Sequence, residues 1–259
     1  MIHALRAEWM RLARPRTFAW VLPLTVIYAA VITYVMMANA APGPGGGAVT
    51  AFALSRDGGG ILSVVSGAAF ASVLLLAVFV GLSAGTMARG TWRAALLHQP
   101  RRLSLAAGTY AAQVLLIALL AAVLLAAGLV SAYAIAPSHG VDTSAWMSLE
   151  SWRMTGEDYV RIVAFAAGWG LLGTLVGVLT RSVAVGLGLA ILWAGPIENI
   201  LGDQLSVMRH WSPGLVLRDM LVPGSAVVPE PRAALVLAAY ALVVVLVLAV
   251  VLRRRDVTA

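Results

Sequence analysis

The chain has 259 residues, of which 61% are hydrophobic and 11% are charged. Soluble globular chains contain about 45–50% apolar and about 25% charged residues, so this composition excludes an ordinary water-soluble domain and is typical of a membrane protein. All 18 basic residues are Arg, and with 11 acidic residues they leave a net charge of +7. The absence of Lys and Cys excludes a P-loop nucleotide site, disulfides and cysteine nucleophiles.

A short amphipathic helix is expected first, over residues 1–15. Ile2, Leu5, Trp9 and Leu12 fall on one helical face, and the neighbouring Arg residues lie off it. We expect this helix to lie along the inner leaflet of the membrane. A simple interfacial anchor and a contact with another subunit are equally good interpretations.

Six apolar stretches follow, and each is long enough to cross the hydrocarbon core, which takes about 20 helical residues. They cover residues 17–38, 61–84, 104–134, 161–180, 183–201 and 233–252. The first stretch also imitates a secretory signal that ends at Ala38-Asn39-Ala40, but its 21 uncharged residues from Phe18 favour a retained span. The sequence therefore predicts an all-α membrane protein with a single transmembrane domain over residues 1–259.

The Arg residues indicate the orientation. With six spans, both termini lie on the same side, which carries twelve Arg and two acidic residues and so a net charge of +10. The opposite side carries six Arg and nine acidic residues, a net charge of −3, and the two sides sum to +7. Loops rich in Arg stay on the cytoplasmic side, so both termini are predicted to be cytoplasmic. The same distribution accounts for the high charge, and nucleic acid is not predicted as a partner.

Two glycine pairs with a spacing of four residues occur in the spans or directly beside them, Gly81 with Gly85 and Gly173 with Gly177. This spacing lets helix backbones approach closely, and we interpret the four residues as helix-packing positions rather than ligand contacts.

The segment Gly81-Leu82-Ser83-Ala84-Gly85 also matches the G-x-S-x-G pattern of serine hydrolases. That pattern needs a strand-to-helix turn and a nearby base, whereas here it falls inside an apolar helix. All four histidines lie outside the spans, and no two of them are close in sequence. No catalytic residue and no metal site are predicted.

The connection between spans two and three, residues 86–103, is predicted to be a docking loop. Trp92, Leu96 and Leu97 are spaced to form an exposed apolar ridge, and Arg residues flank it. Ridges of this kind mark interaction sites. A buried packing element is the alternative.

The segment before the last span is irregular. Span five meets Pro196 and Glu198 early, and charged residues then interrupt an apolar stretch around Pro213-Gly214. This pattern predicts a re-entrant segment, which is stable at membrane depth only where protein or water covers it. Glu198 is the acid nearest the hydrophobic zone and is a candidate for a substrate pathway, although a water-facing or interfacial carboxylate is the preferred interpretation.

The docking loop resembles the cytoplasmic loop of ABC type-2 transporter permeases. In that family a Gly-Thr, an Arg, a Leu pair, a Pro and further basic residues precede the third span, as they do here from Gly90 to Arg102. The ending Arg253-Arg254-Arg255-Asp256-Val257 is similar to the family's C-terminus, and the resemblance extends over the whole chain. The chain departs from the family at Thr86, where many members have an acidic residue that pairs with the partner.

The resemblance implies a half-transporter that pairs with a second permease, the same or a related chain, and with two copies of a separate ATPase subunit. ATP and Mg would bind to the ATPase, and this chain would hold no cofactor. The ATPase contact would be formed by Arg89, Gly90, Thr91, Trp92, Arg93, Leu96, Leu97 and Pro100.

The predicted function is therefore the permease subunit of an ATP-driven exporter in the bacterial cytoplasmic membrane, without enzymatic activity of its own. Its cargo would be a hydrophobic or amphipathic compound such as a drug, natural product, peptide or lipid. One alternative is a membrane scaffold or immunity protein that recruits an ATPase without transport. An ATP-independent carrier is a third hypothesis.

Overall fold

The computed structural model of the protein describes residues 1–41, 49–98, 101–222 and 226–254. Within these ranges the chain is helical, without a β-strand, and a single bridge pairs Ala41 with Thr50. In this described part, six helical stretches are long and apolar enough to cross a membrane: Pro15–Ala38, Gly59–Ala88, Arg102–His139, Leu149–Thr180, Val183–Gly202 and Glu230–Arg254. The predicted all-α class with six candidate spans is confirmed.

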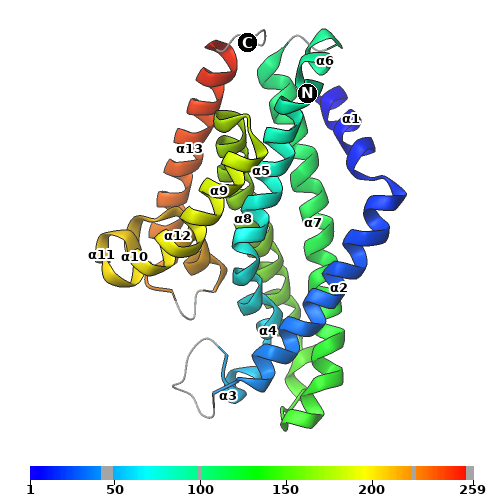
Figure 1. Ribbon diagram of the computed structural model, residues 1–259. Coiled ribbons are helices and arrows are strands. Elements are labelled where there is room, and N and C mark those ends of the chain that lie inside the picture. The colour runs from blue at the N-terminus through cyan, green and yellow to red at the C-terminus, as the bar shows by residue number, and fades with distance from the viewer. Residues whose placement is uncertain (42–48, 99–100, 223–225, 255–259) are drawn as a thin grey trace.

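The helices form an elongated bundle with distinct ends (Figure 1). Helices α1 (Ile2–Leu12) and α6 (Thr91–His98) lie at one end, together with the last turn of α13 (Glu230–Arg254), and the short α3 (Ala51–Leu54) lies at the other. An even number of crossings brings the start of the first span and the end of the last to the same side.

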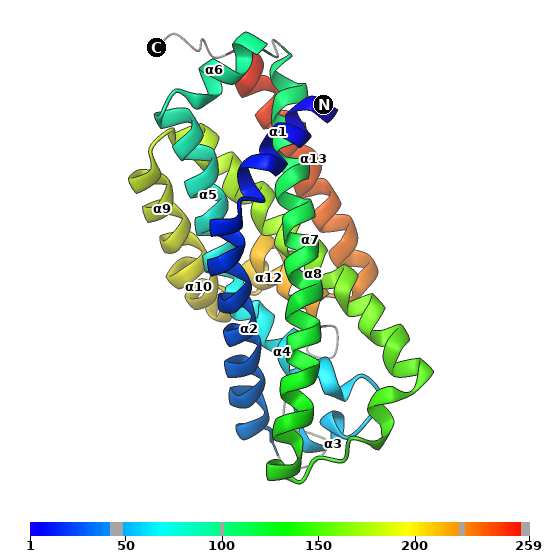
Figure 2. The ribbon, with the colours of Figure 1, turned by 90° about the vertical axis from the view of Figure 1, so that its right-hand side faces the viewer.

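Helix α1 packs against the first turns of α7 (Arg102–Ile135), as Figure 2 shows. Ala4, Glu8 and Leu12 are its buried residues. A Cβ atom added at Gly108 of α7 would lie 2.7 Å from the Cβ of Ala4, so the two backbones are in close contact. Ile2, on the face predicted to be apolar, is exposed. Whether α1 also lies in a lipid interface stays a prediction.

The first two spans pack side by side in the bundle. Helix α2 (Pro15–Ala38) begins with Pro15, a residue that suits the first turn because its missing N–H has no partner there in any helix. The second span consists of α4 (Gly59–Ala68), a 3₁₀ turn η1 (Ala69–Ala71) and α5 (Ser72–Ala88). Together they cover the predicted residues 61–84 with a short extension at each end.

The fourth span is longer than predicted. After the 3₁₀ turns η2 (Ala136–His139) and η3 (Ser144–Met147), α8 runs from Leu149 to Thr180 rather than from residue 161. Arg153 lies 2.5 Å from Glu150 and 2.6 Å from Glu157, at spacings of three and four residues. Such pairs stabilise a helix, which is why the polar segment continues the helix instead of forming a loop.

The region before the last span is a series of short helices. Helix α9 (Val183–Leu192) passes into a π-helical turn η4 (Trp193–Ile197), and α10 (Glu198–Gln204), α11 (Ser206–Trp211) and α12 (Pro213–Leu221) follow. Pro196 lies inside the π turn. Proline lacks an N–H and clashes with the preceding turn, which explains the local widening. Re-entry of this segment into a membrane stays a prediction.

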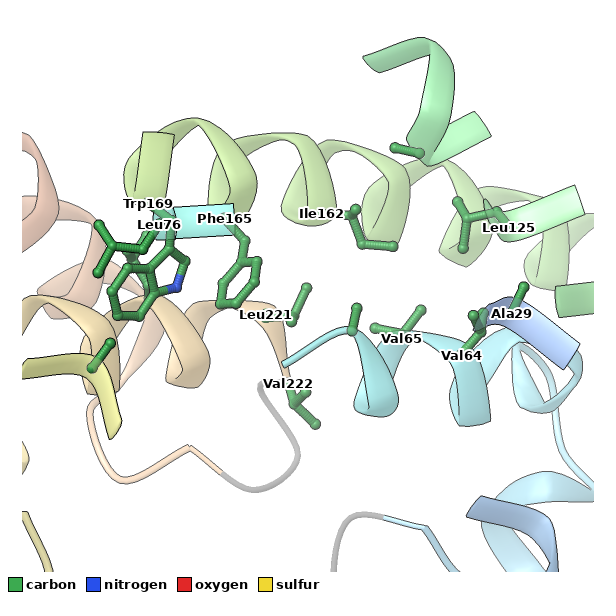
Figure 3. Close-up of a cluster of buried hydrophobic side chains, with 14 of the residues drawn as sticks. Ala29, Val64, Val65, Leu76, Leu125, Ile162, Phe165, Trp169, Leu221 and Val222 are labelled. Atoms are coloured by element: carbon green, nitrogen blue, oxygen red, sulfur yellow. The ribbon is translucent and has the colours of Figure 1, made fainter. Parts of the chain in front are cut away.

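The main buried cluster lies between α2, the second span, α7, α8 and α12 (Figure 3). Its labelled members are Ala29, Val64, Val65, Leu76, Leu125, Ile162, Phe165, Trp169, Leu221 and Val222. Large apolar residues on α2 and α13, such as Trp20 and Leu235, point outward instead. An apolar exterior around a packed interior is the arrangement expected in lipid.

Candidate functional site

A glycine turn positions the predicted docking segment. Helix α5 ends at Ala88, and Gly90 then adopts φ of 69°, a left-handed conformation that glycine reaches without steric cost. The hydroxyl of Thr91 donates a hydrogen bond of 2.9 Å to the carbonyl of Thr86, one of the last carbonyls of α5. This turn sets α6 at the end of the bundle that also holds α1 (Figure 1).

The predicted docking residues differ in exposure. Leu97 is 86% exposed, and Arg89, Thr91 and Arg93 are exposed as well. Trp92 and Leu96 are half-buried. Helix α6 packs on α5 and on the start of α7, so only part of the predicted ridge is open to a partner. Pro100 and the last three residues of the C-terminal motif lie outside the described residues.

A cavity of about 390 Å³ adjoins α6, and sequence reasoning did not predict it. Its walls come from α5, α6, α7, α8 and α13. The lining residues are Leu82, Ser83, Thr86, Met87, Trp92, Leu103, Ala106, Ala107, Thr109, Tyr110, Gln113, Leu171, Thr174, Val178, Val245, Leu248, Ala249 and Leu252. Trp92 therefore faces this cavity, whereas Leu97 is not among the lining residues.

Glu198 is buried in the region before the last span and is hydrogen-bonded to the start of α12. Its side chain is 2% exposed, accepts a hydrogen bond from the Ser212 hydroxyl, and accepts another of 2.8 Å from the backbone N–H of Gly214. Ser212 and Gly214 flank the first residue of α12. A carboxylate at a helix N-terminus satisfies free N–H groups and interacts favourably with the helix dipole. Glu198 therefore caps α12 from within the bundle.

The Glu198 side chain is closely packed on the side that faces Gly214. A Cβ atom added at Gly214 would overlap both the Glu198 carboxylate and the indole of Trp169. The indole N–H of Trp169 is buried without a hydrogen-bond partner in the described part of the chain. Glu198 thus contacts protein groups rather than an open pathway, and its role toward a substrate stays a prediction.

A second buried carboxylate holds the far end of α12. Asp219 accepts a hydrogen bond of 3.0 Å from the backbone N–H of Val228, and the Arg209 guanidinium lies 4.0 Å from its other oxygen. Tyr240 of α13 donates a hydrogen bond of 2.8 Å to the carbonyl of Trp211. These contacts tie the short helices to the last span.

Only one of the two predicted glycine pairs lies in a helix contact. A Cβ atom added at Gly173 would lie 2.8 Å from the Leu76 carbonyl oxygen, and one at Gly177 would lie 2.8 Å from the Cβ of Ser83. Both positions press α8 against α5. A Cβ at Gly81 would meet nothing within 4 Å, and one at Gly85 would meet the guanidinium of Arg89, one turn later.

Two sequence signals could have located these features. Ser212-Pro213 is a helix-start pattern, a capping residue followed by proline at the first position. Gln113 is a polar residue inside an apolar span, and polar residues in such spans are often functional.

Among the described residues, no group of three His, Cys, Asp or Glu side chains is placed to hold a metal ion. Comparison with protein-family models gives no match to this chain, and comparison with curated protein sequences gives none either.

Proposed function

We propose that this chain is the permease subunit of an ATP-driven exporter in a bacterial cytoplasmic membrane, with both termini in the cytoplasm. The observation behind the proposal is α6, a short helix whose Leu97 is 86% exposed at the end of the bundle that also holds α1 and the last turn of α13. An exposed leucine flanked by Arg residues suits an acidic partner surface that has an apolar pocket.

The charge distribution supports the orientation. The same end carries α1, α6 and the Arg residues that close α13, which are the elements expected in the cytoplasm under the positive-inside rule. A chain without Lys cannot form a P-loop, so the energy for transport comes from a separate ATPase in this proposal. Two such ATPases and a second permease would complete the transporter.

The test of the docking surface is capture of an ATPase. The tagged chain is purified from membranes of its native host, the captured proteins are identified by mass spectrometry, and ATP hydrolysis is measured in the eluate. We expect Leu97→Asp to reduce ATPase recovery at least about tenfold, since loss of a hot-spot residue from an interface costs about 2 kcal/mol or more.

Leu149→Asp is the matched control, because Leu149 is 88% exposed at the start of α8, at the opposite end of the bundle. Its recovery of ATPase should equal that of the unmodified protein. Equal recovery with Leu97→Asp would refute the docking surface.

Transport is tested separately with inside-out vesicles and the neutral dye N-phenyl-1-naphthylamine. ATP-dependent accumulation supports the exporter. ATPase capture without accumulation of any tested compound would instead support a scaffold that recruits the ATPase.

A further inference from the structure

The wall of the cavity beside α6 contains one carboxamide side chain among its described lining residues. Gln113 of α7 is 5% exposed and borders the cavity. The described polar atoms that are buried without a partner belong to Thr33, Ser63, Ser66 and Trp169 and not to Gln113, so the Gln113 carboxamide keeps access to the cavity. A carboxamide offers both a donor and an acceptor to a molecule bound there.

Three of the hydroxyl groups in the wall already have acceptors. Tyr110 donates a hydrogen bond of 2.6 Å to the Ala167 carbonyl, and Thr174 donates one of 2.8 Å to the Gly170 carbonyl. Thr86 donates one of 2.8 Å to the Ser83 carbonyl. Gln113 is the one carboxamide among the described lining residues, and it therefore offers an NH₂ donor and a carbonyl acceptor side by side.

The cavity selects against charge. None of its described lining residues is Asp, Glu or Arg, and most are Leu, Val or Ala. An ion in such surroundings would lack a counter-charge and would pay a large desolvation penalty. The volume of about 390 Å³ falls within the range of small-molecule sites, which is roughly 300–1,000 Å³.

We propose that this cavity binds a neutral, mostly apolar small molecule with one amide-like group, and that Gln113 forms paired hydrogen bonds to that group. A ligand amide offers one donor and one acceptor, which matches the side chain of Gln113. A phospholipid headgroup fits this chemistry less well, because no described lining residue is Arg and the Arg102 guanidinium beside the cavity is bonded to the Leu252 carbonyl. Binding of this molecule does not require the ATPase. The further statement that the bound molecule is exported rests on the proposed function.

The position of the cavity connects it to α6. Trp92, the one lining residue from α6, forms part of the wall, while Leu97 of the same helix points away from the bundle. A bound ligand therefore touches the helix that we propose to dock the ATPase.

The experiment uses the purified full chain in phosphatidylcholine nanodiscs. The probe is a ten-carbon carboxamide with a terminal diazirine, and labelled residues are mapped by mass spectrometry; unlabelled decanamide serves as competitor. We expect saturable labelling of the lining residues in α5, α7 and α13. Gln113→Leu should weaken decanamide competition about tenfold, and a diazirine hydrocarbon without the amide should label both proteins equally.

Ala107→Phe tests the volume, because Ala107 lines the cavity and a phenyl ring there would fill it. It should abolish saturable labelling. Ala122→Phe is the matched control, an exposed alanine of α7 that does not line the cavity, and should leave labelling unchanged. If Ala107→Phe does not give a monodisperse protein, the amide-selective loss in Gln113→Leu decides alone.

Labelling that does not saturate, that spreads over the lipid-facing helices, or that is insensitive to Gln113→Leu would overturn the proposal. These results would leave the docking surface unaffected, because no ATPase is present in the assay. Conversely, a failure to capture an ATPase would not alter the expected labelling.

Discussion

Alanine substitutions at Gly177, which lies against another helix, and at Gly81, which does not, should have opposite effects on stability. In Gly177→Ala the new methyl group would lie 2.8 Å from the Cβ of Ser83, 2.9 Å from the amide nitrogen of Ala84 and 3.0 Å from the carbonyl oxygen of Val80. These atoms belong to, or are fixed on, the backbone of α5. Relief therefore requires α5 and α8 to move apart, rather than a rotation of one flexible side chain.

The expected size follows from two opposing terms. Overpacking of an interior costs about 1–3 kcal/mol, and replacing glycine by alanine within a helix gains about 0.5–1 kcal/mol. The clash exceeds the gain, so Gly177→Ala should lower the free energy of unfolding by about 1–2 kcal/mol. Gly81→Ala meets nothing within 4 Å. It should keep only the favourable term and raise the free energy of unfolding by about 0.5–1 kcal/mol.

The assay is unfolding by sodium dodecyl sulfate in mixed micelles, followed by tryptophan fluorescence. The chain has eight tryptophans, so the fluorescence follows unfolding of the whole bundle, and Trp169 on α8 is one of the contributing residues. The two variants should differ by about 2 kcal/mol in the free energy of unfolding. If both variants destabilise the protein equally, or if Gly177→Ala is neutral, the reasoning from backbone contact is refuted.

Two further predictions concern carboxylates. Glu198→Ala removes the acceptor for the buried Ser212 hydroxyl and the buried Gly214 N–H, so it should lower the free energy of unfolding by about 1–3 kcal/mol in the same assay. Glu198→Gln keeps an acceptor oxygen and should lower the free energy of unfolding by less. An equal loss for both variants would contradict the capping role. Hydrogen bonds from the backbone N–H and the hydroxyl of Ser144 lower the pKa of Asp142 below its ordinary value of 3.8. The pKa of Asp142 is lower in the folded protein than in the unfolded chain. The Asp142 carboxylate therefore stabilises this turn at pH values above the unfolded-state pKa, and the stabilisation is lost as the pH falls through the folded-state pKa. Carboxyl-carbon NMR should show Ser144→Ala raising the Asp142 pKa toward 3.8, and an unchanged pKa would refute the assignment.

The glycines illustrate how far a spacing rule extends. All four have the sequence pattern of a close helix contact, yet only Gly173 and Gly177 face another backbone. Which face of a helix meets a neighbour depends on rotation about the helix axis. In an apolar span every face is similar in composition, so no hydrophobic stripe reveals the rotation.

Glu198 shows the same limit for a polar residue. The sequence identified it as the acid nearest the hydrophobic zone, but its acceptor role depends on Ser212 and Gly214, which lie 14 and 16 residues later. A capping partner that is distant along the chain comes close only after the π turn and the short helices have folded back. The sequence predicted helix breaks at Pro196 and Pro213, but it did not predict how the chain folds between them.

By itself, the sequence determined the number of candidate spans and the approximate bounds of all but the fourth, because transfer of about 20 apolar residues into a bilayer depends on composition rather than on contacts. The tertiary structure decided which glycines touch, how α12 is capped and where Gln113 meets a cavity beside α6. These features depend on packing between helices that lipid surrounds, where side chains of nearly equal hydrophobicity are distinguished by shape and by hydrogen bonds.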